Sequence, residues 1–338
     1  MSPRPTTTGW SPVSRDPRSL TEAAARFFAR SAASSWVPGY LASRGIDART
    51  ACRWQVGYAP AGRTELCDHL RGLGYTSAQA RAVGLARPGF TDVFRDRAMF
   101  AVRAVDGTVA GFIGRATVGG VPVYLNTAAT ELYRKGSLLF GLYEGAEALA
   151  AGARPVLVEG PLDALAVSCA GRVGVAPCGT ALTAEQAELL GWAMRRPRQT
   201  GVAVAFDADR AGRAAAVRAY SLLRAITDEL WTVSWPAGTD PADVLRAGGA
   251  AGLAAVLDSS LLPLPDLVVD ARLAAFGRWL EFADGAFAAL RAVAPVIAGL
   301  PPAQVARQVA RTAGRLGLSY AEVTEAVTSA LTAISRTG

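Results

Sequence analysis

Five carboxylates in the middle of this sequence have the spacing to do chemistry together. They stand at or just beyond the ends of short apolar runs, and they are Glu159, Asp163, Asp207, Asp209 and Asp240. Carboxylates that converge repel one another and are costly to bury unpaired, so a divalent cation is their natural compensation. Oxygen ligands with no histidine or cysteine beside them favour Mg²⁺ or Mn²⁺ over zinc.

The apolar runs that would position these acids alternate with helical patterns. Short runs that predict strands lie at 154–160, 172–177, 201–207 and 230–235. Apolar residues three and four apart predict helices over 162–171, 183–196 and 210–226. Such alternation predicts an α/β fold with a parallel sheet flanked by helices, in which ligands gather at the carboxyl ends of the strands. The five acids are therefore expected at one edge of the sheet.

The acids should occupy different positions within those elements. Asp163 falls in the first turn of a helix opened by Pro161. Asp207 and Asp209 are two residues apart, so strand geometry would point both the same way. Helix capping is an alternative role for any one of the aspartates. It does not account for Glu159, which precedes its helix in a loop of small residues.

Two arginines follow the Asp207–Asp209 pair. Arg210 and Arg213 lie at the start of a predicted helix, where backbone N–H groups already favour anions. The spacing supports two roles equally, because these side chains could bind phosphates or act as counter-ions of the two aspartates.

Composition narrows the class of protein. The chain has 338 residues, a net charge of +7, four cysteines and one histidine. The cysteines do not approach the spacing of a zinc ribbon, so no zinc is expected and the thiols are predicted to be small buried groups. The positive charge admits a polyanionic partner, above all nucleic acid. Because neither a membrane helix nor a signal peptide is evident, we expect no membrane partner and a cytoplasmic location.

The periodicity of the remaining chain predicts further domains on either side. A flexible tail is expected over 1–18 and an α+β subdomain over 19–150, with a hairpin around Asp106-Gly107. The α/β domain then covers 151–261. From 262 to 338 only helical periodicity remains, which predicts a small helical bundle.

The motifs in combination resemble a known family. VEGPLDALA, PCGTALT, AFDADRAGRAA and GTDPADVL resemble the TOPRIM domain, in the order found in bacterial replicative primases of the DnaG type. YLASRGI, WQVGYAPAG, FRDRAMFAVRAVDGTVAGFIGRA and YLNTAATELYRKGSLLFGLYE resemble the polymerase core of those primases, and RLGLS resembles its later part. The resemblance covers roughly residues 25 to 330 and makes 151–261 the TOPRIM catalytic domain.

This resemblance implies synthesis of short RNA primers from ribonucleoside triphosphates on a single-stranded DNA template. The five acids would hold Mg²⁺ or Mn²⁺, with Glu159 closest to the place of a general base. The residues implied to be catalytic are Glu159, Asp207, Asp209 and Lys135. Those implied to bind template or nucleotide are Arg44, Arg115, Tyr124, Asn126, Lys135 and Arg210.

Lys135 is conspicuous because it is the one lysine among 35 lysine and arginine residues. It lies in the Lys-Gly-x-x-Leu-x-Gly-Leu-Tyr segment, which in the family belongs to a basic surface facing the active site. A compact ammonium is a different phosphate partner from a planar guanidinium. We therefore interpret its placement as functional.

The sequence departs from the family pattern in several places. The family's Asp-Pro-Asp reads Asp-Pro-Ala-Asp, so Ala242 occupies the second acidic position and Asp243 comes one residue late. On a helix this shift rotates the side chain by about 100°, which predicts a weakened second metal site. Val123 stands where a basic residue is usual. The zinc-binding and helicase-binding domains of the family are not matched, so a replicative helicase or a zinc-module protein in trans is an expected partner.

Two other functions stay open. TOPRIM acids also serve metal-dependent nucleases, although the similarity upstream of residue 150 belongs to primases. A non-catalytic single-stranded-DNA-binding replication adaptor would bind through arginines and be indifferent to Mg²⁺. The adaptor remains an alternative because Ala242 occupies the position of an acid in the family.

Overall fold

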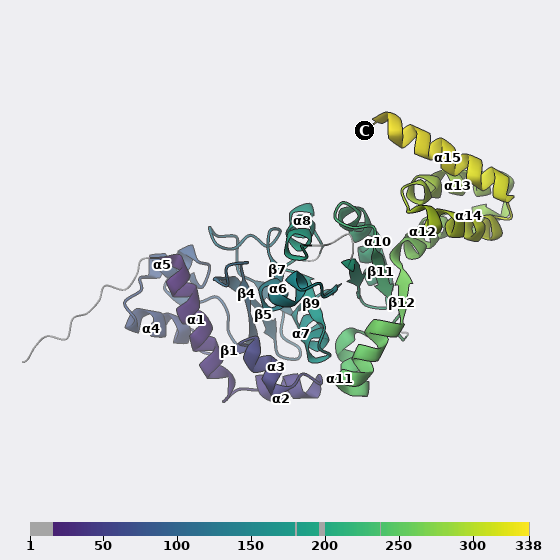
Figure 1. Cartoon of the computed structure of the whole chain (residues 1–338). Helices are drawn as coiled ribbons and strands as arrows, with labels where there is room; N and C mark the ends of the chain where they lie inside the picture. Colours follow the sequence, from purple (N-terminus) through teal and green to yellow (C-terminus); the bar gives the residue numbers. More distant parts are fainter. Residues whose placement is uncertain (1–15, 180, 196–199, 237, 338) are drawn as a thin grey trace, which may run out of the picture. The chain divides into compact units, whose positions relative to one another are not determined.

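The computed structural model describes residues 16–179, 181–195, 200–236 and 238–337 (Figure 1). The chain folds as two compact units. The N-terminal unit comprises the chain up to Ser43 together with Asp47–Leu138, and the C-terminal unit comprises Arg44–Ile46 and Leu139–Gly338. Most of the tail expected over 1–18 lies outside the described residues. The division into four domains stays a prediction.

An antiparallel sheet in the order β1-β4-β5-β6 forms the base of the N-terminal unit. Its strands are β1 (Gly57–Ala59), β4 (Arg97–Arg103), β5 (Val109–Ala116) and β6 (Tyr124–Asn126). Asp106 and Gly107 make the turn of the expected β4–β5 hairpin, with the glycine at φ 85°, where a side chain would be strained. The helix α1 (Pro17–Ala32) packs on β1 and β5, and its Phe28 meets Phe112 edge-on in the core.

Short elements complete this unit. They are α2 (Val37–Ser43), α3 (Ala48–Arg53), α4 (Glu65–Gly72), α5 (Ser77–Ala82) and the ribbon of β2 (Ala86–Arg87) with β3 (Thr91–Asp92). The buried carboxylate of Asp92 accepts hydrogen bonds from the backbone N–H groups of Leu66 and Cys67, both at 2.9 Å, and so holds the start of α4. The expectation of buried thiols is confirmed for Cys67 and Cys178 and wrong for Cys52, which is exposed.

The C-terminal unit contains a six-stranded sheet in the order β12-β11-β10-β8-β9-β7. The four predicted strands are present as β8 (Pro155–Leu157), β9 (Val173–Pro177), β10 (Val202–Val204) and β11 (Leu230–Val233). These four pair in parallel, as the alternation predicts. The sheet is mixed overall, because β7 (Leu139–Phe140) and β12 (Leu261–Pro263) add antiparallel edges that the sequence pattern did not indicate.

Among the described residues, several helices accompany this sheet. They are α6 (Leu142–Ala150), α7 (Pro161–Cys169), α8 (Ala184–Ala193), α10 (Arg210–Arg224) and α11 (Pro241–Ser259). Thr183 and Gln186 form a capping box that starts α8, each side chain bonding the other's backbone N–H. Gly174 in β9 lets α7 approach the sheet, because an added Cβ would lie 2.6 Å from the Ala164 carbonyl oxygen. The strand ends and the helix starts that follow them thus have fixed positions.

Four helices and one 3₁₀ turn follow the sheet: α12 (Leu264–Ala274), η1 (Gly277–Glu281), α13 (Ala283–Ala298), α14 (Pro302–Leu316) and α15 (Tyr320–Thr337). The predicted helical bundle is present, and its apolar core is continuous with that of the sheet. The helix α12 ends at Ala274, and η1 begins at Gly277, whose φ of 52° lies in the left-handed region. No helix among the described residues is long and apolar enough to cross a membrane.

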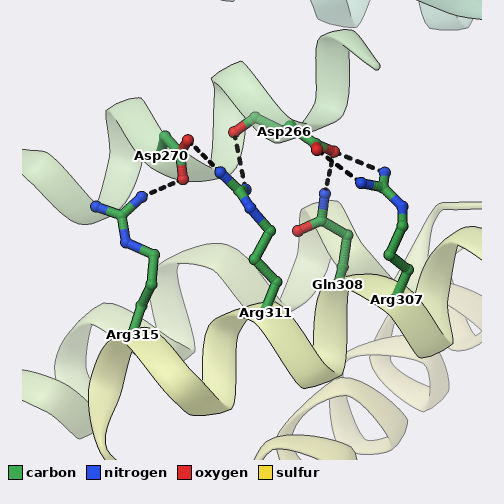
Figure 2. Close-up of polar contacts among 6 residues, drawn as sticks. All are labelled: Asp266, Asp270, Arg307, Gln308, Arg311 and Arg315. Carbon is green, nitrogen blue, oxygen red and sulfur yellow. Dashed lines mark hydrogen bonds and ion pairs between the residues drawn. The ribbon is translucent and has the colours of Figure 1, made fainter. Parts of the chain in front are cut away.

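A charge ladder joins α12 to α14 (Figure 2). We use this name for Asp266, Asp270, Arg307, Gln308, Arg311 and Arg315. Arg307 binds both oxygens of Asp266, at 2.6 and 2.7 Å, and Gln308 donates to the same carboxylate at 2.5 Å. Arg311 and Arg315 both pair with Asp270. Every carboxylate of the ladder is thus met by at least one guanidinium.

Candidate functional site

The five predicted acids follow three neighbouring strands of the C-terminal unit. Glu159 lies in the loop after β8, and Asp163 is in the first turn of α7, as expected. Asp207 lies just after β10, Asp209 caps α10, and Asp240 caps α11 beyond β11. Since β8, β10 and β11 are parallel neighbours, their carboxyl ends share one edge of the sheet. We call these five residues the acid cluster.

Electrostatics indicates that the members of the cluster face one another. Burial, followed by the charges of Asp240, Asp207 and Glu159, raises the pKa of Asp163 well above its ordinary value. Burial, with Glu159 and Asp240 next in weight, raises the pKa of Asp207 to about 6. Asp163 and Asp207 therefore feel the neighbouring carboxylates as negative charge, which Arg44 partly offsets at Asp163.

The backbone brings Glu159 and Asp207 into direct contact. The backbone N–H of Asp207 donates to Oε1 of Glu159 at 3.2 Å. Gly212 in α10 makes this possible, because an added Cβ would collide with the Asp207 carbonyl oxygen and lie 2.9 Å from Oε1 of Glu159. The glycine of the Asp-Arg-Ala-Gly motif thus lets the helix fit against two of the acids.

The expectation that Asp207 and Asp209 share strand geometry is wrong. β10 ends at Val204, so both residues lie in the turn that leads to α10. Oδ1 of Asp209 accepts from the backbone N–H of Gly212 at 2.7 Å, which makes Asp209 a helix cap. Its charge still reaches Asp207, whose pKa it helps to raise. Capping and membership of the cluster are therefore compatible.

Asp240 is engaged on both oxygens. Oδ1 accepts from the backbone N–H of Asp243 at 2.6 Å as the cap of α11, and Oδ2 pairs with Nη2 of Arg44 at 3.1 Å. Nη1 of Arg44 lies 3.4 Å from Oδ1 of Asp243. Ala242, at the position where the family has an acid, is fully buried. Arg44, which the resemblance assigns to template or nucleotide, thus pairs with carboxylates of its own unit.

The two arginines after Asp209 do not neutralise the cluster. Among the described residues, neither Arg210 nor Arg213 forms an ion pair with Asp207 or Asp209, and Arg213 donates to the Ala208 carbonyl at 3.3 Å. This removes the counter-ion interpretation for the described part of the chain. Arg213 and Asp207 instead line a small cavity of ≈ 190 Å³ whose wall includes Trp235.

The donor chemistry of the cluster suits a hard divalent cation. All its side-chain donors are carboxylate oxygens, the ligands that Mg²⁺ and Mn²⁺ prefer. Within the described residues, no three histidine, cysteine or acidic side chains are already gathered closely enough to hold a metal ion. The raised pKa values of Asp163 and Asp207 indicate a need for positive charge at the same place. The cluster therefore fits a metal by composition and charge.

A second set of predicted residues gathers on the sheet of the N-terminal unit. Arg115 on β5 pairs in register with Tyr124 on β6, and its guanidinium lies 4.7 Å from the ring centre of Tyr40 and 5.7 Å from that of Tyr124. The hydroxyl of Tyr133 donates to Asn126 at 3.0 Å. Sequence reasoning missed Tyr40, although it opens the quoted YLASRGI motif. Lys135 lies exposed in a turn of the same unit.

Comparison with known proteins identifies the family to which the chain belongs. Residues 27–146 match the DNA primase catalytic core, N-terminal domain, and residues 156–245 match a Toprim-like domain. The RNA polymerase domain of Mycobacterium tuberculosis primase DnaG, solved with double-stranded DNA, is 31% identical with a TM-score of 0.75, over 91% of this chain and 99% of that one. The chain belongs to the DnaG-type primase catalytic cores.

Other members of this primase family support the same assignment. The DNA primase of Streptomyces coelicolor is 33% identical over 286 residues, covering 82% of this chain and 44% of the relative. That of Deinococcus radiodurans is 36% identical over 259 residues, covering 74% and 44%. A DnaG primase catalytic domain solved with single-stranded DNA is 28% identical over 90% of this chain, with a TM-score of 0.74. The chain thus spans less than half the length of these curated primases.

Proposed function

We propose that this protein is a primase polymerase core, which makes short RNA primers on single-stranded DNA by metal-dependent nucleotidyl transfer. The observation that carries the proposal is the acid cluster at the ends of β8, β10 and β11, in a chain that aligns with almost the whole of a primase RNA polymerase domain. Carboxylates that repel one another in the free protein are suited to a site that collects cations and triphosphate.

The proposed reaction is attack by the primer 3′-hydroxyl on the α-phosphorus of a ribonucleoside triphosphate. A new phosphodiester bond forms, the α–β bridge breaks, and pyrophosphate leaves. Mg²⁺ or Mn²⁺, held by the acid cluster, would supply charge neutralisation at the phosphates. Glu159 would accept the hydroxyl proton, and the hydrogen bond from the Asp207 backbone N–H to its Oε1 would orient the carboxylate for this role.

The remaining chemistry of the chain would orient the substrates. Arg115, Tyr124 and Asn126 lie together on β5 and β6 and would bind template, with the 39% exposed ring of Tyr124 available for stacking on a base. Lys135 and Arg210, both exposed, would bind phosphates. The related catalytic domain solved with single-stranded DNA supports a single-stranded template for this chain.

Partners beyond the template follow from the same proposal. A core of this type would act with a replicative helicase or with a zinc-module protein in trans. Because replication takes place there, the cytoplasm is the proposed location.

One observation favours a second candidate, the non-catalytic replication adaptor. Ala242 offers no carboxylate, and Asp243 pairs with Arg44 and Arg246. A protein that had lost metal-dependent synthesis would still bind single-stranded DNA through its arginines. The nuclease has no comparable support in the described residues.

The test measures incorporation of labelled ribonucleotides on single-stranded DNA with Mg²⁺ or Mn²⁺. Short RNA is expected from the wild type, with at least a ~10³-fold loss in Asp207→Asn and about a tenfold loss in Lys135→Ala. Asp258→Asn is the matched control, because Asp258 pairs with Arg172 away from the cluster.

Three results would decide against primer synthesis or its mechanism. Unchanged metal-independent DNA binding without synthesis would support the adaptor, and shortened template would support the nuclease. Full activity in Asp207→Asn would contradict the proposed role of the cluster.

A further inference from the structure

Arg44 is held rigidly against the start of α11. The next residue, Gly45, has a φ of 77°, and an added Cβ there would lie 3.1 Å from Cγ of Leu245 and 3.2 Å from the backbone of Arg246. The backbone of this segment therefore lies directly on the helix, in the same unit as the acid cluster. This backbone contact positions the Arg44 guanidinium beside Asp240 and Asp243.

Arg44 pairs with the two carboxylates at the start of α11, those of Asp240 and Asp243. Oδ2 of Asp240 pairs with Arg44 at 3.1 Å while Oδ1 caps α11 at 2.6 Å. Oδ1 of Asp243 lies 3.4 Å from Arg44. The three side chains are only 25–28% exposed, so water screens the pairs incompletely. A cation bound by Asp240 would have to displace Arg44 or lie beside its positive charge.

No described guanidinium contacts the other carboxylates of the cluster, although the charge of Arg44 reaches Asp163 and opposes the rise of its pKa. Glu159, Asp163, Asp207 and Asp209 form no ion pair with any described residue. Ala242, in the first turn of α11, provides no further oxygen, because its side chain is a buried methyl group. Asp240 is thus paired with a guanidinium, whereas the other four carboxylates are paired with none among the described residues.

We infer that the Arg44 guanidinium takes the place of a second divalent cation at the Asp240 end, so that the free protein binds one divalent ion, at the end formed by Glu159, Asp163, Asp207 and Asp209. Arg44 is a positioning residue in this account. The inference rests on the proposed function to the extent that the acid cluster binds metal. Beyond the proposed function, the inference states how many divalent ions the free protein binds and which residue, Arg44, limits that number.

The test counts bound Mn²⁺ by electron paramagnetic resonance of the free ion, with the full chain and no nucleotide. The wild type is expected to bind one Mn²⁺ per chain. Arg44→Gln, which keeps a hydrogen-bonding side chain but removes the charge, is expected to bind a second Mn²⁺ at least tenfold more tightly than the wild type does. Arg44→Lys keeps the charge and should keep the count at one.

Arg246→Gln is the matched control. Arg246 also contacts Asp243, at 3.5 Å, but is 59% exposed, so its removal should leave the count at one. Circular dichroism checks the fold of each variant. If Arg44→Gln does not fold, Arg44→Lys still tests the inference. A second Mn²⁺ bound by Arg44→Lys would contradict the role of the positive charge.

The inference is overturned by a wild type that binds two Mn²⁺ equally or none, or by an Arg44→Gln variant with an unchanged count. Primer synthesis is measured separately. Two equal ions together with full synthesis would overturn the inference and leave the proposed function standing. The expected counts without synthesis would support the inference and contradict the proposed function.

Discussion

The acid cluster and the charge ladder place carboxylates in opposite situations within one unit. In the ladder, Asp266 and Asp270 are met by Arg307, Arg311 and Arg315 (Figure 2). In the cluster, burial and neighbouring carboxylates raise the pKa values of Asp163 and Asp207, and among the described residues only Asp240 forms an ion pair with a guanidinium. Charges that serve folding are paired inside the chain, whereas charges that await a ligand are not. The metal-free cluster should therefore lower the free energy of unfolding, whereas the ladder should raise it.

Removing one carboxylate from each region should have opposite effects on folding. Asp266→Asn is expected to lower the free energy of unfolding by about 2 kcal/mol, because three donors lose a charged acceptor. Asp207→Asn should leave it unchanged or raise it, because it relieves repulsion. Urea unfolding at neutral pH without metal measures both. Equal losses in the two variants would remove the distinction between the regions.

The pH dependence of stability should come from the cluster. The pKa of Asp207 is raised to about 6 from 3.8, so between these values the folded state binds a proton that the unfolded state has released. Stability must then fall as pH rises through this window, by about 1 kcal/mol after allowance for solvent screening. The raised pKa of Asp163 acts in the same direction.

Comparing wild type with Asp207→Asn isolates this effect. The wild-type unfolding free energy in metal-free buffer should decrease from pH 4 to pH 7 relative to that of the variant. A difference that does not change with pH would show that Asp207 titrates normally in the folded protein.

The smallest expected effect concerns salt. Arg315 is 43% exposed and shares Asp270 with Arg311, so Arg315→Gln should cost only about 0.5 kcal/mol. The cost should shrink in 1 M NaCl, where screening shortens the reach of exposed charges to about 3 Å. Thermal unfolding at low and high salt measures this, with Arg218→Gln, exposed on α10, as the control. A cost that is independent of salt would mean that Arg315 acts through packing.

The sequence allowed prediction of the parts of the fold that local patterns control. Apolar runs and helical periodicity located β8, β9, β10 and β11, and the position of Glu159 ahead of its helix already set it apart from a cap. The edge strands β7 and β12 were missed, because each is two or three residues long and has no recognisable period.

Contacts between distant residues could not be predicted in the same way. Arg44 and Asp240 are separated by 196 positions, and no motif links them. The ladder depends on how α12 and α14 align in space, which the periodicity of each helix alone does not determine. Asp209 was expected in strand geometry because the end of β10 at Val204 leaves no clear mark in the run VAVAFD. The residue types of the cluster were thus predictable, and its internal pairing was not.

The most direct test of the account is the effect of saturating Mg²⁺ on the thermal unfolding midpoint of wild type, Asp207→Asn and Asp266→Asn. A ligand that binds only the folded state raises the midpoint. Mg²⁺ should raise it equally in wild type and in Asp266→Asn, although the latter starts lower, and should have little effect on Asp207→Asn. An equal rise in all three proteins, or none in the wild type, would contradict the claim that the acid cluster is left unpaired to bind a cation.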